Sequence, residues 1–139
     1  MSSSDFHGSC LCGDVAFAIS GPVPDLYQCH CSLCRKVTGS AANAAFVVPA
    51  RNFRWLSGEA TLRSYVRAGG YRIDFCPRCG SPCPNPMRDG TGVWVPAGLL
   101  DEAIVSRVAA HIHVGSKAAW DEIGGSAPRH REGFGSDPA

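Results

Sequence analysis

The sequence predicts a mainly β protein whose small sheets are joined by loops and supported by bound metal. Sixteen glycines and ten prolines interrupt a chain of 139 residues, which leaves room for short strands between them. No long amphipathic helix is evident. Eight cysteines, most of them in close clusters, indicate metal ligands that would compensate for a thin hydrophobic core.

Short strands are predicted along most of the chain. The first lies at residues 14–20, where apolar and polar residues alternate. Its apolar face would hold Val15, Phe17 and Ile19. Residues 68–70 suit a hairpin turn between two later strands. The other segments of strand composition are residues 25–30, 44–49, 52–56, 61–66, 71–75, 92–100 and 111–115.

Helices are expected to be few and short. Residues 32–39 suit a helical turn that ends at Gly39, and residues 116–124 suit a short helix with Ser116 as its N-cap. Residues 125–139 contain few apolar side chains and many turn formers, so we expect a polar tail that is mobile or loosely docked. Residues 1–124 would then form one domain.

Charge and hydropathy exclude several classes of function. The net charge is +1 with both signs mixed, so no strong field favours nucleic acid or an anionic membrane as a partner. No apolar run approaches the ~20 residues that span a bilayer. The N-terminus has neither the basic start nor the apolar stretch of a secretory signal. We therefore expect a cytoplasmic protein that binds neither nucleic acid nor membrane.

The cysteines are expected to bind metal, because disulfides are rare in a reducing compartment. The strongest pattern is C-P-x-C-G at residues 76–80, in which Cys76 and Cys79 would share one ion and Gly80 would allow the turn. Closely paired thiols in such a turn usually serve a metal. Two further ligands must come from elsewhere, and Cys10 and Cys12 are the natural pair.

The Cys10-x-Cys12 pair requires a bend in the chain. Sulfurs around one zinc lie roughly 3.7 Å apart, whereas a flat strand separates residues i and i+2 by nearly twice that distance. Gly8 and Gly13 would allow the chain to curl. The resulting site of four cysteines would join segments more than sixty residues apart in the chain, which constrains the unfolded chain, so we expect its role to be structural.

Three cysteines remain, Cys29, Cys31 and Cys34. A zinc with three protein ligands and one open position is typical of a catalytic site. Two alternatives stay open: Cys83 could close this site as a fourth thiolate, and His30 could bind, although strand alternation would turn it away. A rubredoxin-like iron site is a further alternative, but it usually has two C-x-x-C turns and this sequence has one.

Other candidate residues give weaker signals. His111 and His113 would face one side of a late strand and could line a pocket, although a packed or surface pair is the simpler interpretation. The three tryptophans are most simply part of the core or a pocket wall. They are Trp55, Trp94 and Trp120.

Three motifs resemble the glutathione-dependent formaldehyde-activating (GFA) family, whose domain is shared with centromere protein V. They are "GSCLCGDVAFAISGP", "YQCHCSLCRKVTGS" and "FCPRCGS", and the resemblance extends over roughly residues 6–123. It implies a β-tent fold of small coiled sheets with two zinc ions. It also implies a structural zinc held by one cysteine set and a catalytic zinc held by the other. The structural set is Cys10, Cys12, Cys76 and Cys79, and the catalytic set is Cys29, Cys31 and Cys34.

The resemblance implies carbon–sulfur lyase chemistry on S-(hydroxymethyl)glutathione, the adduct of glutathione and formaldehyde. The partners would be glutathione or a similar small thiol and a small aldehyde. Arg35 and Lys36 are placed to offset the negative charge of three thiolates or to meet the carboxylates of glutathione. Because thiols add to formaldehyde readily without help, the alternative is a non-catalytic, zinc-stapled module that binds a thiol ligand or a protein partner.

Overall fold

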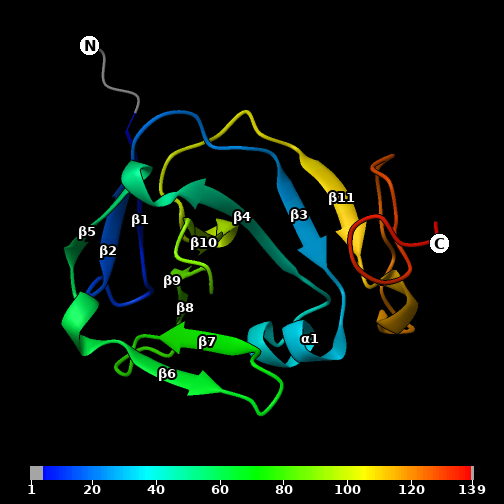
Figure 1. Cartoon of the computed structure of the whole chain (residues 1–139), viewed down its shortest axis with the longest axis horizontal. Coiled ribbons are helices and arrows are strands. Elements are labelled where there is room, and N and C mark those ends of the chain that lie inside the picture. Colours follow the sequence, from blue (N-terminus) through cyan, green and yellow to red (C-terminus); the bar gives the residue numbers. More distant parts are fainter. Residues whose placement is uncertain (1–4, 139) are drawn as a thin grey trace. The chain divides into compact units, whose positions relative to one another are not determined.

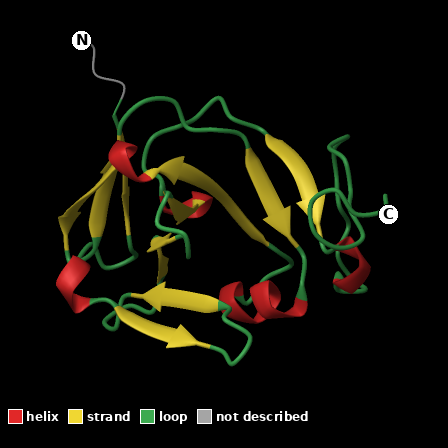
Figure 2. Ribbon diagram, viewed as in Figure 1, coloured by secondary structure: helices red, strands yellow, loops and turns green. Residues whose placement is uncertain are grey.

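The computed structural model describes residues 5–138 and confirms the mainly β fold. Within these residues it contains three small sheets, one α-helix and four short 3-10 helices (Figure 2). None of the described helices is long and apolar enough to cross a membrane. The outer ends of the predicted domain and tail, residues 1–4 and 139, lie outside the described residues.

The described chain forms two compact units. Unit 1 consists of the residues up to Pro24 together with Phe46–Val105, and unit 2 consists of Asp25–Ala45 together with the residues from Ser106 on. Strand β4 (Asn43–Pro49) begins in unit 2 and ends in unit 1. Every cysteine falls clearly into one unit, so each unit can be described with its own cysteines.

Unit 1 contains two antiparallel, three-stranded sheets, ordered β1-β2-β5 and β6-β7-β8. Strands β6 and β7 lie side by side and form the predicted hairpin, with Gly70 in its turn at a φ of 96° (Figure 1). The end of β4 pairs with β10, which pairs with β9. The strands are β1 Phe6–Ser9, β2 Ala16–Ile19, β5 Phe53–Ser57, β6 Arg63–Val66, β7 Arg72–Phe75, β8 Pro82–Cys83, β9 Asn85–Pro86 and β10 Gly92–Pro96. The 3-10 helices of this unit are η1 Ala50–Asn52, η2 Glu59–Thr61 and η3 Ala97–Leu99.

The apolar face predicted for residues 14–20 forms the core beneath the sheet that contains β2. Val15, Phe17 and Ile19 are fully buried, and the Phe17 ring stacks on Phe53 with 5.3 Å between centroids. Gly8 lies opposite Phe17 in β1, and a side chain there would collide with the Phe17 ring. Gly8 therefore serves close packing of the strand, and the prediction that it helps the chain to curl is wrong.

Unit 2 places its helix directly after a central strand. Strand β3 (Leu26–Cys29) pairs in parallel with β11 (Val108–Ile112) and antiparallel with the start of β4. Helix α1 (Ser32–Thr38) follows β3, and the predicted stop at Gly39 is confirmed. Gly39 has a φ of 65°, and its N–H donates to the carbonyl of Arg35 over 2.8 Å, which satisfies one of the last carbonyls of the helix.

The helix predicted at residues 116–124 is wrong. A short 3-10 helix, η4 (Val114–Ser116), is followed by irregular chain with a single turn, in which the N–H of Asp121 donates to the carbonyl of Ala118. The Asp121 carboxylate is hydrogen-bonded to His30, 91 residues earlier in the chain. That long-range bond fixes the segment in a conformation that local helix propensity does not predict.

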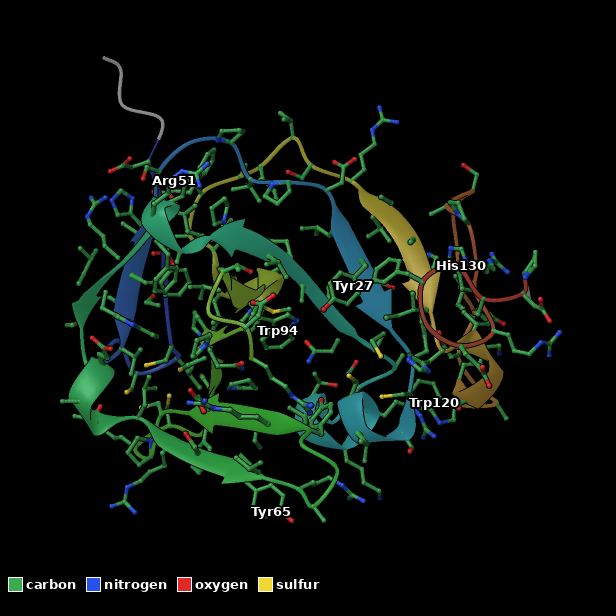
Figure 3. All side chains as sticks on the ribbon, in the orientation of Figure 1. Tyr27, Arg51, Tyr65, Trp94, Trp120 and His130 are labelled. Atoms are coloured by element: carbon green, nitrogen blue, oxygen red, sulfur yellow. The ribbon has the colours of Figure 1, made fainter. Side chains whose placement is uncertain are left out.

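The tryptophans differ in their surroundings. Trp55 packs against Phe53 with their rings 4.9 Å apart, as expected for a core or pocket residue, and Trp94 is half-buried. Trp120 is 69% exposed, so the prediction that it belongs to a core or pocket wall is wrong. Figure 3 shows where the side chains of Trp94 and Trp120 lie, and it also shows exposed Tyr65 projecting away from β6.

The described part of the C-terminal segment is hydrogen-bonded to β11. The N–H of His111 donates to Pro128, and the N–H of His130 donates to the carbonyl of His111 over 2.8 Å. The Phe134 ring meets Tyr27 edge to face at 5.3 Å. The mobility proposed for residues 125–139 and the domain boundary at residue 124 stay predictions.

Candidate metal centres

The structure brings Cys10, Cys12, Cys76 and Cys79 together in unit 1, and we call these the four-cysteine group. Cys10 and Cys12 lie in a turn just after β1. The N–H of Gly13 closes this turn on the carbonyl of Cys10, and Gly13 adopts a φ of 86°. The curl predicted for this pair is therefore present.

The second half of the group comes from the turn that follows β7. The N–H of Gly80 donates to the carbonyl of Cys76 over 2.7 Å, and Gly80 adopts a φ of 81°. A residue with a side chain rarely adopts this conformation, so the turn depends on glycine here. The tight turn brings the sulfur of Cys79 close to the sulfur of Cys76, so that both could bind one ion.

The sulfurs of the four-cysteine group are spaced as a tetrahedral zinc requires. The Sγ atoms of Cys10 and Cys12 are 3.7 Å apart, as are those of Cys12 and Cys76. Four ligands at about 2.3 Å from a tetrahedral zinc would have sulfurs roughly 3.7 Å apart. All four sulfurs lie within 4.8 Å of one another. The donor set therefore fits zinc in number, chemistry and spacing.

Hydrogen bonds around this group favour thiolates. The hydroxyl and the backbone N–H of Ser81 lower the pKa of Cys79 to about 5. The N–H of Val15 points to the Cys10 sulfur at 3.3 Å. At Cys12 the N–H of Asp14 acts in the same direction, but burial and the neighbouring thiols raise its pKa to about 12. Four thiolates this close together need a cation between them, which is a further indication of a metal site.

Cys83 packs beside the four-cysteine group without belonging to it. It is 1% exposed and shares a hydrophobic cluster with Cys10, Val15 and Cys76. Burial, followed by the charges of the neighbouring cysteines, raises its pKa to about 12. A thiol in this environment behaves as a small apolar side chain.

Cys29, Cys31 and Cys34 come together in unit 2, and we call these the three-cysteine group. Cys29 is the last residue of β3, Cys31 is the N-cap of α1, and Cys34 is buried in the first turn of that helix. The N–H of Cys34 donates to the Cys31 sulfur over 3.3 Å, as an N-cap hydrogen bond does. The end of a strand and the start of a helix thus hold the three sulfurs on a rigid frame.

The three-cysteine group also fits a zinc ion. Its sulfurs lie within 4.8 Å of one another, and the described residues supply these three protein ligands to the group. A hydrogen bond with Cys34 and then burial raise the pKa of Cys29 well above its ordinary value. Three neighbouring thiols cannot all ionise without a cation, and a zinc ion would provide one. Three thiolates would leave a tetrahedral ion one open position.

His30 lies between two of these cysteines, and both of its ring nitrogens have partners. Its Nδ1 is 2.8 Å from the carboxylate of Asp121, and its Nε2 is 3.0 Å from Nδ1 of His111. His30 is 1% exposed and His111 is 5% exposed. His30 therefore has no nitrogen left for a metal. Its two hydrogen bonds connect the loop between β3 and α1 to β11 and to the segment around Asp121.

The predicted pair of His111 and His113 is not on one face of a strand. His111 is the fourth residue of β11, whereas His113 follows the end of that strand with a φ of 55°. The left-handed conformation of His113 turns the chain into η4 and breaks the alternation of side chains. The interpretation that they line one pocket is therefore wrong, although His111 does belong to the network around His30.

Arg35 and Lys36 follow Cys34 in α1 but have different surroundings. Arg35 is partly buried, and its Nη2 donates to the carbonyl of Ser116 over 3.3 Å. Lys36 is exposed. The side chain of Arg35 is therefore held against the chain at Ser116, while Lys36 extends into solvent.

Unit 1 also contains a cavity of about 360 Å³. Its wall includes the aromatic rings of Phe53 and Trp55 and the carboxylate of Asp74. Asp74 is buried and accepts hydrogen bonds from Ser64 at 2.6 Å and from Arg72 at 2.8 and 2.9 Å. Both carboxylate oxygens of Asp74 already accept hydrogen bonds, which stabilise the hairpin of β6 and β7. Asp74 is therefore a poor candidate for a hydrogen bond to a ligand.

The surroundings of the cysteines include two residues that the sequence patterns do not predict, Asp121 and Ser81. Asp121 stands in a segment with helical composition, and only the folded chain brings it to His30. Ser81 directly follows the C-P-x-C-G motif, so its position could have indicated a hydrogen bond to the preceding thiolate.

The family resemblance is confirmed by comparison with known proteins. A family model described as glutathione-dependent formaldehyde-activating enzyme matches residues 5–116. The crystal structure of a Rhodobacter sphaeroides protein, a structural genomics target, is similar in fold, with a TM-score of 0.58 and 21% sequence identity over 73% of this chain and 98% of that chain. Because the family model spans most of the sequence and the cysteines of both groups fall within it, the chain belongs to the glutathione-dependent formaldehyde-activating enzyme (GFA) family.

Proposed function

We propose that the protein is a zinc-dependent carbon–sulfur lyase that acts on the adduct of glutathione, or a related thiol, with formaldehyde or another small aldehyde. In the direction of adduct formation, the thiol sulfur bonds to the aldehyde carbon and the thiol proton ends on the aldehyde oxygen. The lyase direction breaks the same carbon–sulfur bond. The observation that carries the proposal is the three-cysteine group, together with membership of the family.

The residues of the three-cysteine group would hold the catalytic zinc. When bound there, the zinc would supply an open coordination position at which a thiol is deprotonated at neutral pH. Cys29, Cys31 and Cys34 would fix that position relative to β3 and α1. His30 would keep the loop that joins these two elements in place through its bonds to Asp121 and His111.

Arg35 would orient the substrate. Its Nη2 is engaged by Ser116, and its Nε is buried without a hydrogen-bond partner among the described residues. A guanidinium held in this way can offer its remaining N–H groups to a carboxylate, and glutathione carries two. Exposed Lys36 would add positive charge nearby, and both cations would offset the negative charge of three thiolates.

The four-cysteine group would hold a second, structural zinc. Its sulfurs come from segments 64 residues apart and lie at the core of unit 1. With four thiolates it would have no position for a substrate. We further propose that the protein works in the cytoplasm, where its eight free cysteines would stay reduced and glutathione would be available.

The proposal is tested by exchange spectroscopy, because the uncatalysed reaction is itself fast. Nuclear magnetic resonance exchange measurements with glutathione and ¹³C-labelled formaldehyde report the rate at which adduct and free aldehyde interconvert. The wild-type protein should raise that rate in proportion to its concentration. Cys31→Ser should remove the increase, whereas Cys83→Ser, which alters a buried thiol outside both groups, should retain it.

A wild-type protein that binds glutathione without raising the exchange rate would contradict the lyase proposal. That result would favour the non-catalytic binding module instead. An equal increase with Cys31→Ser would mean that the three-cysteine group is not the site of the reaction.

A further inference from the structure

Two buried side-chain nitrogens lack a hydrogen-bond partner among the described residues, Nε of Arg35 and Nδ2 of Asn43. Asn43 as a whole is only 5% exposed. Buried donors are nearly always paired, because an unpaired one loses its bond to water and gains nothing in return. The amide of Asn43 therefore needs an explanation that the folded chain itself does not provide.

Asn43 lies directly opposite a member of the three-cysteine group. It is the first residue of β4, and its partner in the antiparallel register with β3 is Cys29. Residues directly opposite each other in an antiparallel pair project to the same face, with Cβ atoms about 4.5–5.5 Å apart. The Asn43 amide thus shares a face with the Cys29 sulfur, yet no sulfur of the group accepts a hydrogen bond from its Nδ2.

We propose that Asn43 donates this hydrogen bond to the hydroxyl oxygen of a hemithioacetal bound at the three-cysteine group. The inference rests on the proposed function and names the substrate feature that the site recognises. In a hemithioacetal the hydroxyl oxygen is bonded to the carbon that carries the sulfur. A sulfur held beside Cys29 therefore brings that oxygen into the neighbourhood of the Asn43 amide.

This contact would make Asn43 a residue that determines specificity. A plain thiol has no oxygen next to its sulfur, and neither has an S-alkyl thioether. A site built to bond a substrate hydroxyl discriminates strongly against analogues without it, because its own buried polar group is then left unpaired. Asn43 would therefore distinguish the aldehyde adduct from glutathione itself.

A distinctive consequence concerns the stability of the free protein. Because the Nδ2 donor has no partner before a ligand binds, its removal should not lower the melting temperature. Asn43→Val has a similar size and suits a strand, and Asn43→Ala is a smaller second variant. The matched control is Thr38→Val in α1, which removes a hydroxyl that donates to the carbonyl of Cys34 over 2.9 Å and should lower the melting temperature.

The binding experiment uses the zinc-loaded protein with three probes: glutathione, S-methylglutathione, and glutathione with excess formaldehyde. Calorimetry of the wild type should show the tightest binding for the formaldehyde mixture. Asn43→Val should reduce the preference for this mixture over S-methylglutathione about tenfold, as expected for one hydrogen bond. The side-chain amide resonance of Asn43 in a ¹⁵N-labelled sample should shift with the formaldehyde mixture and not with S-methylglutathione.

The outcomes separate this inference from the proposed function. If Asn43→Val keeps the full preference for the formaldehyde mixture, the inference is wrong while the proposed function stands. A lower melting temperature for both Asn43 variants, with the preference unchanged, would show that Asn43 is structural. If the wild type binds none of the three probes, the proposed function itself fails, and the inference fails with it.

Discussion

Loss of one cysteine from each group should have very different effects on stability. Cys12 and Cys76 are 64 positions apart in the chain, whereas Cys31 and Cys34 are 3 apart. Because the entropy of loop closure grows with the logarithm of loop length, joining the longer loop constrains the unfolded chain by about 3 kcal/mol more. Binding of a structural zinc contributes folding free energy on the order of 10 kcal/mol, against about 5–15 kcal/mol of net stability for a whole domain.

Cys76→Ser should therefore yield protein that is unfolded or insoluble. Cys31→Ser should stay folded, and its melting temperature should exceed that of any soluble Cys76→Ser by at least about 10 °C. The assay is a melting curve followed by tryptophan fluorescence, with metal analysis of the same samples. Cys83→Ser is the control, because it makes the same chemical change at a thiol that is also 1% exposed and packs in the same cluster as Cys76.

Two results would contradict these expected stabilities. If Cys31→Ser unfolds as readily as Cys76→Ser, both groups support the fold and the division of roles is wrong. If Cys83→Ser is as destabilising as Cys76→Ser, the effect belongs to burial of a hydroxyl and not to loss of a metal ligand.

Two further predictions concern the network around His30. Asp121→Ala should lower the free energy of unfolding by about 1–3 kcal/mol in urea titrations, because it leaves Nδ1 of buried His30 without its partner, whereas Ala in place of exposed Glu122 should change little. Burial, then the charges of His30 and Arg129, lower the pKa of His111 below its ordinary 6.5, with Asp121 acting in the opposite direction. As the pH falls below 6.5 the unfolded chain takes up a proton before the folded protein does, so stability should decrease. Melting curves between pH 7.5 and 5 should show less of this decrease for His111→Gln, and an equal decrease would contradict the assignment to His111.

The cysteine groups could be predicted from the sequence because their spacing is mostly local. Cys76 and Cys79 share one turn, and Cys31 and Cys34 share the first turn of a helix, so short-range geometry brings each pair together. The glycines at 13, 39, 70 and 80 occupy backbone conformations with positive φ, and this requirement follows from residue type alone. The two pairs of the four-cysteine group could be assigned to one site because a closed zinc site takes four ligands and each pair supplies two.

The rest depends on contacts between distant segments. Strand β1 has the sequence FHGS, which carries no strong strand signal, and it pairs with β2 because Gly8 leaves room for the Phe17 ring. Residues around Asp121 have helical composition but are held by His30. Nothing in the sequence around Asn43 marks it as a donor, because its importance arises from register with Cys29.

We expect the protein to hold two zinc ions, one closed to ligands and one with an open coordination position. The most direct test is metal content per chain, combined with the absorption spectrum of the cobalt-substituted protein before and after addition of glutathione. We expect two ions per chain and a spectral change at one of them, and this change should be lost in Cys31→Ser. One ion per chain, or two ions whose spectra are both unchanged by glutathione, would contradict the assignment of one closed and one open site.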